Sequence, residues 1–336
     1  MTDQAVRPGP AFALRRSPAL RLIGNRLLTA IPVLWGVTFV TFAVIQLLPG
    51  DAAQQLLGIN ATQQQVDEFR AKLNLDDPFL VRYFHWLGDV LTGNLGHSLA
   101  SDQPVTSILS DGLPTTFQLL AYALFISLIF TVPIALLAAR NPGGFVDRVG
   151  MLTSMAGLSV ANYVLAVVLV YVFAVQLGWL PAIYTNDTGT PGELIKSLTL
   201  PALAIGFPLF CFYTRLLRAD ILEQMQGEDY VVTAKAKGVG PWRVLVRHAL
   251  PNSLFGLLTI VALNVGTLIG ATVIIEQIFA VPGIGHSLLE AINNRDVPVV
   301  EGIVLVLAVV VVISNLLADV LYAVLDPRIR YGRSAA

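Results

Sequence analysis

The chain has 336 residues, of which 55% are hydrophobic and 13% charged, and its mean hydropathy is +0.71. Soluble domains carry about 25% charged residues, so this composition points to a bilayer rather than to two water-soluble domains. The net charge of -1 supplies no field that attracts a polyanion, which excludes nucleic acid as a partner. The single cysteine, Cys211, excludes an internal disulfide, and we interpret it as a small buried apolar residue.

Stretches without Asp, Glu, Lys or Arg predict the membrane-spanning helices, because a helix needs about 20 apolar residues to cross the hydrocarbon core. Six such stretches occur, at residues 27–50, 112–139, 149–186, 197–214, 249–275 and 302–318. In the third, a span near residues 150–176 suffices, and Trp179 marks its exit into the interface. The first is too long for a cleavable signal peptide and is expected to remain as an anchor.

These spans predict the organisation of the chain. We expect a tail over 1–20, a first transmembrane helix region over 21–50, an extracytoplasmic loop subdomain over 51–111, a five-helix transmembrane domain over 112–325 and a tail over 326–336. The connecting segments on one side, which include both tails, carry 16 Lys and Arg residues, and those on the other side carry 5. Positive charge is retained in the cytoplasm, so both termini are expected to be cytoplasmic.

The extracytoplasmic loop contains two apolar patterns. The stretch Gln63 to Leu73 predicts an amphipathic helix, and a second apolar set follows it, at Phe84, Trp86, Leu87, Val90 and Leu91. We expect these two to pack together, either as a simple cap over the membrane domain or as a docking or gating surface. His85 and His97 stand apart from other metal-ligating residues and do not indicate a metal site.

The cytoplasmic loop over 215–248 is too polar to span the membrane, and it predicts a helix, a sharp turn and a second helix. Tyr230, Ala234 and Gly238 recur every four residues and so share one face of the first helix, with Lys235 and Lys237 at its edge. A face of small residues lets another protein's backbone approach closely. The loop is therefore either a docking element or an amphipathic helix lying on the lipid surface.

Polar residues inside the spans are candidates for a pathway or a gate, because an ionisable or amide group is costly there without a partner or water. Asn315 and Asp319 lie four residues apart in the last span, and Asn264 and Thr267 form a polar patch in the fifth. Asp319 lies near the cytoplasmic end, where interfacial packing is an alternative role. The nearby glycines at 266 and 270 indicate close helix packing.

The sequence has no phosphate-binding G-x-x-x-x-G-K-[ST] motif, no H-E-x-x-H and no G-x-S-x-G, so neither an ATPase nor a hydrolase is expected in this chain. Any energy input must come from another protein. The two halves show no inverted repeat, which weighs against a self-contained secondary carrier. A stand-alone channel or carrier and an intramembrane enzyme remain as alternatives from other classes.

Several long motifs in a fixed order give the chain a specific resemblance. They are LLPGD, LDDPFLVRYFHWLGDVLTGNLGHSL, PVTSILSDGLPTTFQL, EDYVVTAKAKG followed by RHALPN, EQIFAVPGIGHSLLEAINNRDVPVVEG and NLLADVLYAVLDPRIRY. Nearly the whole chain thereby resembles the permease subunits of bacterial ABC importers for dipeptides, oligopeptides and, in some members, nickel. It departs from the family pattern at Asn94, His286 and Ser287.

The resemblance implies an all-α integral membrane protein with six transmembrane helices of the type I importer permease kind, in the bacterial inner membrane. Its EDYVVTAKAKG motif would form a coupling helix that fits a groove on an ATP-binding subunit. The matching positions are Glu228, Asp229, Tyr230, Ala234, Lys235, Lys237 and Gly238. The implied partners are a second homologous permease, two ATP-binding subunits, an extracytoplasmic substrate-binding protein and membrane lipid.

The resemblance also implies a non-catalytic subunit with no cofactor or metal of its own, since ATP and magnesium would bind to the partner subunits. Alternating access by rigid-body motion is the expected mechanism, and a bulky residue at Gly238 is expected to abolish uptake. Peptide is the expected cargo. A nickel chelate or a glutathione-like molecule is not distinguished from it by this sequence.

Overall fold

The computed structural model describes residues 18–47, 62–64, 77–186 and 189–325. Residues 1–17 of the expected first tail, the whole of the expected second tail and most of the expected helix from Gln63 to Leu73 lie outside these residues, while residues 18–20 belong to the first helix. The described helices are α1 (Pro18–Leu47), α4 (Phe79–Leu91), α5 (Val105–Arg140), α6 (Phe145–Ser159), α7 (Asn162–Leu169), α8 (Pro191–Gly227), α9 (Asp229–Ala236), α10 (Pro241–Val244), α11 (Leu250–Ile278), α12 (Ile284–Asn293) and α13 (Val297–Leu325). Two π-helical segments, η1 (Val170–Gln176) and η2 (Leu245–Ala249), continue α7 and α10. The all-α class is confirmed.

Five helices are long and apolar enough to cross a membrane, at Arg26–Val44, Val105–Arg140, Pro191–Gly227, Pro241–Ile278 and Val297–Val320. The sixth candidate differs from the straight helix expected near 150–176, because α6 and the α7–η1 helix meet at 106°. At this break Val160 and Ala161 are extended. The Ser159 hydroxyl donates to the Met155 carbonyl, a contact that commonly accompanies helix bending.

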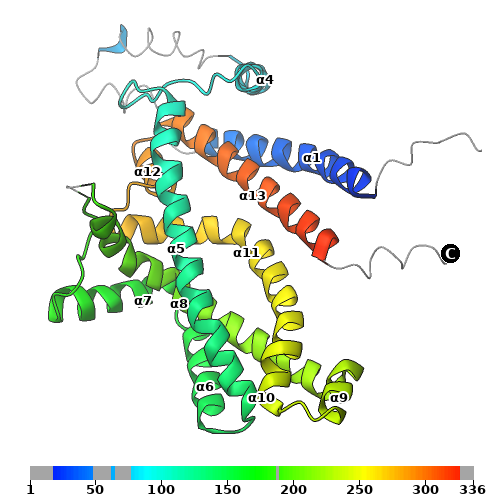
Figure 1. Ribbon diagram of the computed structural model, residues 1–336. Coiled ribbons are helices and arrows are strands. Elements are labelled where there is room, and N and C mark those ends of the chain that lie inside the picture. The colour runs from blue at the N-terminus through cyan, green and yellow to red at the C-terminus, as the bar shows by residue number, and fades with distance from the viewer. Residues whose placement is uncertain (1–17, 48–61, 65–76, 187–188, 326–336) are drawn as a thin grey trace, which may run out of the picture.

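The long helix α5 runs through the middle of the molecule and packs closely along α8 (Figure 1). Small residues allow this approach, since a Cβ on Gly206 of α8 would lie 2.8 Å from the Ala123 carbonyl oxygen of α5. A buried cluster joins α5, α7, α8 and α11, with Leu119, Leu200 and Ile205 fully or almost fully buried. The bundle core therefore lies around the α5–α8 pair.

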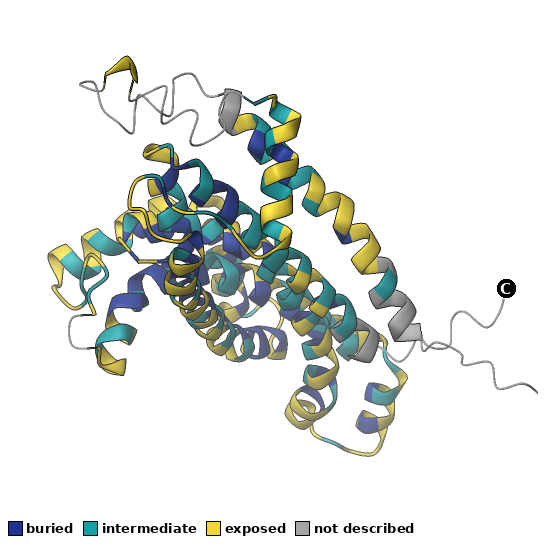
Figure 2. Ribbon diagram, turned by 90° about the horizontal axis from the view of Figure 1, so that it is seen from above, coloured by how far each residue is buried: buried dark blue, intermediate teal, exposed yellow. Residues whose placement is uncertain are grey.

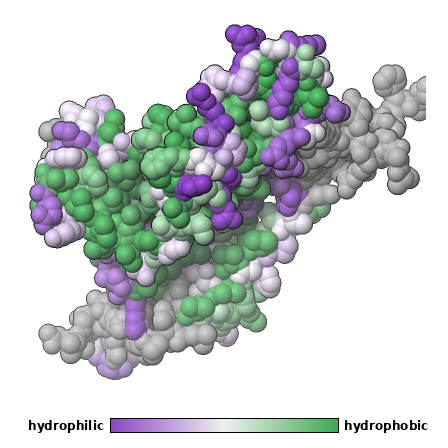
Figure 3. Space-filling view, turned by 90° about the horizontal axis from the view of Figure 1, so that it is seen from below, coloured by the Kyte–Doolittle hydropathy of each residue, from purple (hydrophilic) through white to green (hydrophobic). Residues whose placement is uncertain are grey.

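The outside of the bundle is apolar, as expected for a membrane protein. Large exposed hydrophobic side chains occur along α1, α5, α6 and α7, and Figure 2 shows exposed residues around the rim of the described bundle. The view from below in Figure 3 shows a broad hydrophobic surface with hydrophilic groups gathered at its margins. This distribution suits lipid or another apolar protein surface around the spans.

An ion pair buried between helices fixes the start of α6 against α8. Asp147 accepts hydrogen bonds from Nε and Nη2 of Arg218 and from the Gly143 amide, the last at 2.7 Å. The two side chains are only 5% and 19% exposed. Removing one partner of such a pair leaves an uncompensated charge in a poorly solvated site.

Substituting Asp147→Ala is expected to lower the free energy of unfolding by about 3 kcal/mol, because Arg218 loses both of its charged contacts. The matched control is Asp111→Ala, which removes an exposed carboxylate from α5 and is expected to change stability by less than about 0.5 kcal/mol. Thermal unfolding in detergent measures both variants. Equal melting temperatures for the two would contradict a stabilising role of the pair.

Candidate functional site

The helix α9 occupies a corner of the chain between α8 and α10, at the lower end of the molecule in Figure 1. The corner arises at Glu228, which is extended (φ -94°, ψ 130°) and interrupts the helical path after Gly227. Its carbonyl accepts the amides of Val231 and Val232 at 3.0 and 3.2 Å, which begins the new helix. The expected order of helix, turn and second helix is confirmed.

A left-handed glycine ends α9. Gly238 has φ +77°, and the Val239 amide donates to the Ala234 carbonyl at 3.1 Å. A Cβ at this position would meet nothing within 4 Å. Backbone conformation, and not lack of space, therefore explains the glycine.

The face of α9 that carries Ala234 packs against the chain itself. Val231 and Ala234 are buried against Val244 of α10. Tyr230 is half-buried, and its hydroxyl donates to the Gln224 side chain in α8. Tyr230 and Ala234 thus lie on the face that attaches α9 to α8 and α10, whereas Gly238 lies beyond the end of the helix and is exposed.

The opposite face of α9 is exposed. Asp229, Val232, Thr233 and Ala236 share this face at helical spacing, and we call them the outer face of α9. Val232 is 60% exposed and is the largest apolar side chain of this face. The sequence did not predict this face, because the adjacent residues Val231 and Val232 are chemically identical. Only the position of α10 shows that Val231 is covered and Val232 is exposed.

Basic residues surround the outer face of α9. Lys235 and Lys237 are exposed beside it, and the Lys235 ammonium donates to the Met225 carbonyl at 3.2 Å. Across α10, the Arg140 guanidinium at the end of α5 lies 5.3 Å from the centre of the Trp242 ring. This cation–π contact ties α5 to α10.

The four polar residues predicted as a pathway or gate do not converge on one cavity. Asn264 donates to the Tyr213 hydroxyl of α8 at 3.4 Å, and Thr267 is exposed and donates to the Asn264 carbonyl. Asp319 pairs with Arg26 of α1, with Oδ2 and Nε 2.7 Å apart. Asn315 is exposed on α13.

The two glycines of α11 behave differently. Gly266 packs against α13, since a Cβ there would lie 3.3 Å from Val311. Gly270 is exposed and has nothing within 4 Å of a Cβ position. Close helix packing is therefore present at the first glycine, while the second leaves an open surface within this chain.

A buried carboxylate joins three helices at the other end of the bundle. Glu276 of α11 accepts the Thr116 hydroxyl of α5 at 2.7 Å and the amides of Gly285 and His286 at 2.8 and 3.1 Å. It is fully buried and caps the first turn of α12. Added Cβ atoms at Gly283 and Gly285 would collide with it. The EQIFAVPGIG motif thus encodes a structural junction.

A second carboxylate ties the outer loop to the bundle. Asp296, between α12 and α13, accepts the Ser98 hydroxyl and the amides of Leu99 and Ala100, the first amide at 3.0 Å. Because Asp296 is buried, these bonds fix the end of the loop in place.

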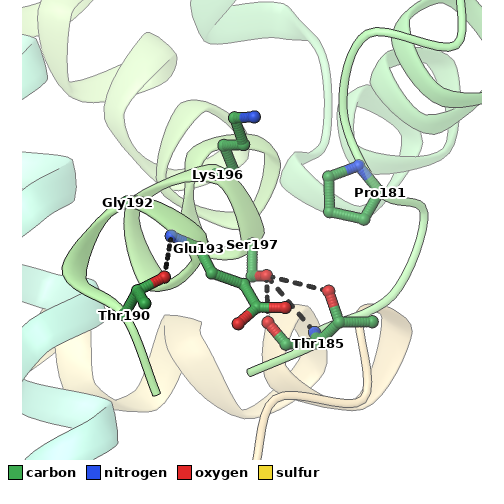
Figure 4. A pocket seen from close by; sticks show the side chains of 7 residues that line it. All are labelled: Pro181, Thr185, Thr190, Gly192, Glu193, Lys196 and Ser197. Carbon is green, nitrogen blue, oxygen red and sulfur yellow. Dashed lines mark hydrogen bonds between the residues drawn. The ribbon is translucent and has the colours of Figure 1, made fainter. Parts of the chain in front are cut away.

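A pocket of about 540 Å³ lies where the segment after η1 meets the start of α8. Its lining residues are Pro181, Thr185, Thr190, Gly192, Glu193, Lys196 and Ser197 (Figure 4). The Ser197 hydroxyl donates to the Thr185 carbonyl, and the Thr190 hydroxyl accepts the Glu193 amide at 3.4 Å. None of the predicted pathway residues lines it. Among the described residues, no group of three or more His, Cys, Asp or Glu is arranged to hold a metal.

The sequence matches two family descriptions. They are "Binding-protein-dependent transport system inner membrane component" over residues 131–331 and "Binding-prot-dependent transport system membrane comp, N-term" over residues 19–120. Among similar proteins, the dipeptide transport system permease protein DppB of Alkalihalophilus pseudofirmus is 37% identical over 328 residues, covering 91% of this chain and 98% of that protein. The probable peptide ABC transporter permease protein y4tP of Sinorhizobium fredii is 38% identical with the same coverage. The oligopeptide transport system permease protein AppB of Bacillus subtilis is 34% identical, also at 91% and 98%.

The turn after α9 yields a test that separates backbone conformation from surface contact. Gly238→Val is expected to raise tryptic cleavage after Lys237 severalfold, because a β-branched residue at positive φ costs about 1–3 kcal/mol and opens the turn. Gly238→Asn is expected to stay close to the parent chain, since Asn tolerates this conformation. Limited proteolysis in detergent measures the rates. The control is Gly240→Ala, at φ -60° with open space around it; cleavage rising as much in this control would contradict the conformational explanation.

Proposed function

The chain belongs to the family of binding-protein-dependent transport system inner membrane components, and from this membership we propose that it is the peptide-conducting permease subunit of an ATP-driven importer. It is a non-catalytic, multi-pass subunit of the inner membrane. The observation that carries the proposal is the outer face of α9. This small exposed surface has apolar and polar residues with lysines beside it, and the opposite face of the same helix is packed against the chain.

In this proposal the outer face of α9 seats in a groove of an ATP-binding subunit. We expect the groove to offer Val232 an apolar recess, because burying this exposed side chain would contribute favourable free energy to binding. Lys235 and Lys237 at the edge, with Arg243 and Arg247 nearby in the chain, favour a groove whose rim carries carboxylates. Lys235, Lys237 and Gly238 act from the end of the helix, while Tyr230 and Ala234 hold it to its own chain.

Movement of the groove would reach the spans through side-chain contacts. Val231 and Ala234 couple α9 to α10, the Arg140–Trp242 contact couples α10 to α5, and the Asp147–Arg218 pair couples α8 to α6. ATP and magnesium bind to the partner subunits and drive alternating access by rigid-body motion. This chain supplies the coupling helix α9 and half of the transport pathway, and a second homologous permease supplies the other half.

Among the polar residues of the spans, Thr267 and Asn315 are the better candidates for the pathway, since both stay exposed within this chain. Asn264 and Asp319 hold neighbouring helices, which suits a gate that changes when those helices separate. Both termini are cytoplasmic in this arrangement, in keeping with the excess of Lys and Arg on the α9 side.

The cargo is a dipeptide or oligopeptide, delivered by an extracytoplasmic substrate-binding protein. Support comes from relatives named for dipeptide and oligopeptide transport that match over 91% of the chain. A nickel chelate or a glutathione-like molecule would need the same architecture. No contact among the described residues favours either over a peptide.

Cysteine labelling tests the docking face. In a Cys211→Ala background, single cysteines at positions 232 and 236 are expected to react with a maleimide about tenfold more slowly when the ATP-binding subunits are bound, because the groove covers an interface core. A cysteine in place of the exposed Ser101, in the outer loop, is the control and is expected to react equally in both states. Unchanged rates at 232 and 236 in an assembled complex would refute docking at this face.

Reconstitution tests the cargo and the energy source. Liposomes containing the two permeases, the ATP-binding subunits and the binding protein are expected to import labelled dipeptide only with ATP inside, since this chain carries no phosphate-binding motif. Uptake by this chain alone would support a channel or carrier instead. Competition by excess nickel chelate, without competition by unlabelled peptide, would reassign the cargo.

A further inference from the structure

The helix α4 packs one face against α1 through aromatic rings. Phe79 and Tyr83 meet Phe39 and Phe42 with ring centres 5.3–5.6 Å apart, all edge to face. The Tyr83 and Thr38 hydroxyls are hydrogen-bonded at 2.9 Å, and Tyr83 is fully buried. This face attaches α4 to α1 where the two helices cross (Figure 1).

The contact lies beside the membrane-spanning part of α1. Thr38 lies inside the apolar stretch Arg26–Val44 of α1, and the helix continues past that stretch to Leu47. The contact between Thr38 and Tyr83 is therefore at the level of the membrane-spanning stretch and not beyond its end. At this depth, any surface of α4 that no protein covers is in contact with the lipid of one leaflet.

A second face of α4 is apolar and exposed. Leu80, Phe84 and Leu91 are 56%, 60% and 81% exposed, and Leu87 lies between them at helical spacing. The polar residues His85 and Asp89 occupy the remaining side and are also exposed. One helix thus presents a docked face, an apolar face and a polar face.

The cation of α4 is directed away from the apolar face. Arg82 lies with its guanidinium carbon 5.8 Å from the centre of the Phe42 ring, and the carboxylates of Glu301 and Asp77 act on it. Burial lowers the pKa of Arg82, and these two carboxylates oppose that shift. Glu301 is itself buried at the start of α13, so its charge acts on Arg82 from that helix.

We propose that α4 is an interfacial helix whose Leu80–Phe84–Leu91 face is immersed in the lipid of the outer leaflet. The assignment of the leaflet rests on the proposed orientation of the importer. Lipid is favoured over a protein partner because the docked face fixes α4 at the depth of the span, where exposed Val40 and Val44 of α1 continue the apolar surface. An apolar face opposite a polar one is also the pattern of helices that lie in the membrane interface.

This immersion would hold the α1–α13 pair at a set height. Arg26 and Asp319 join the two helices at one end, and the ring contacts of Phe79 and Tyr83 attach α4 to α1 nearer the other end. The segment at the start of the chain then acts as a fixed membrane anchor and not as a receptor for the binding protein.

Lipid quenching in nanodiscs tests the immersion. The assembled importer carries Cys211→Ala and one cysteine labelled with an environment-sensitive fluorophore, at Phe84 or Leu91 on the apolar face or at His85 or Asp89 on the polar face. Phospholipids with a nitroxide near the top of the acyl chain are expected to quench the first two labels at least about twofold more than the last two.

Equal quenching on both faces would overturn the proposal. So would weak quenching at positions 84 and 91 combined with protection by the binding protein or by the second permease, since either result would assign the face to a protein. This experiment measures lipid contact and not transport. Its outcome is therefore independent of the α9 labelling and peptide-uptake experiments that test the proposed function.

Discussion

The attachment of α9 to its own chain is the contact on which the proposed coupling depends. Val231 and Ala234 pack against Val244, and the left-handed turn at Gly238 brings α10 back along the helix so that this packing is possible. A helix of eight residues has little stability alone. Its inner face must therefore be used for folding, which leaves only the outer face for a partner. A loosely attached α9 would absorb a partner's movement instead of passing it to α5 and α8.

Buried carboxylates play a related part at the opposite end. Glu276 accepts hydrogen bonds from backbone amides across the following turn, and Asp296 accepts them from a segment distant in sequence. Both carboxylates are almost completely buried. Water is scarce at these positions, so a carboxylate without such donors would be strongly destabilising. The donors hold α5, α11, α12 and the end of the outer loop in one arrangement. The end of the bundle that carries α9 uses Asp147 and Arg218 to the same effect, with a guanidinium as the donor.

The spans were predictable because the absence of charge over about 20 residues is a local property of the sequence. The bend after Ser159 was not, since two extended residues inside an apolar run leave its composition unchanged. For α9, the sequence identified the helix, the terminating glycine and the neighbouring lysines. It did not identify the outward face, because that depends on α10, which folds back through a turn. The pairing of Asp319 with Arg26 was not predictable either, because the two residues are 293 positions apart in the sequence and helical periodicity relates only residues of the same helix.

The described contacts form two groups of helices, which meet along α11 and also at the outer-loop end, where Val105 and Leu109 of α5 pack against α12 and α13. The first group holds α1, α4 and α13 together by edge-to-face ring contacts and the Arg26–Asp319 ion pair, and the second holds α5, α6, α8, α9 and α10. At Gly266, α11 approaches α13 closely, with the Val311 side chain 3.3 Å from the position of an added Cβ. A glycine at such a contact lets two helices approach closely, whereas ion pairs and edge-to-face ring contacts hold the helices within the groups together. A force applied at α9 is therefore expected to move the second group relative to the first near Gly266 of α11, while the packing of α5 with α12 and α13 holds the opposite end in place.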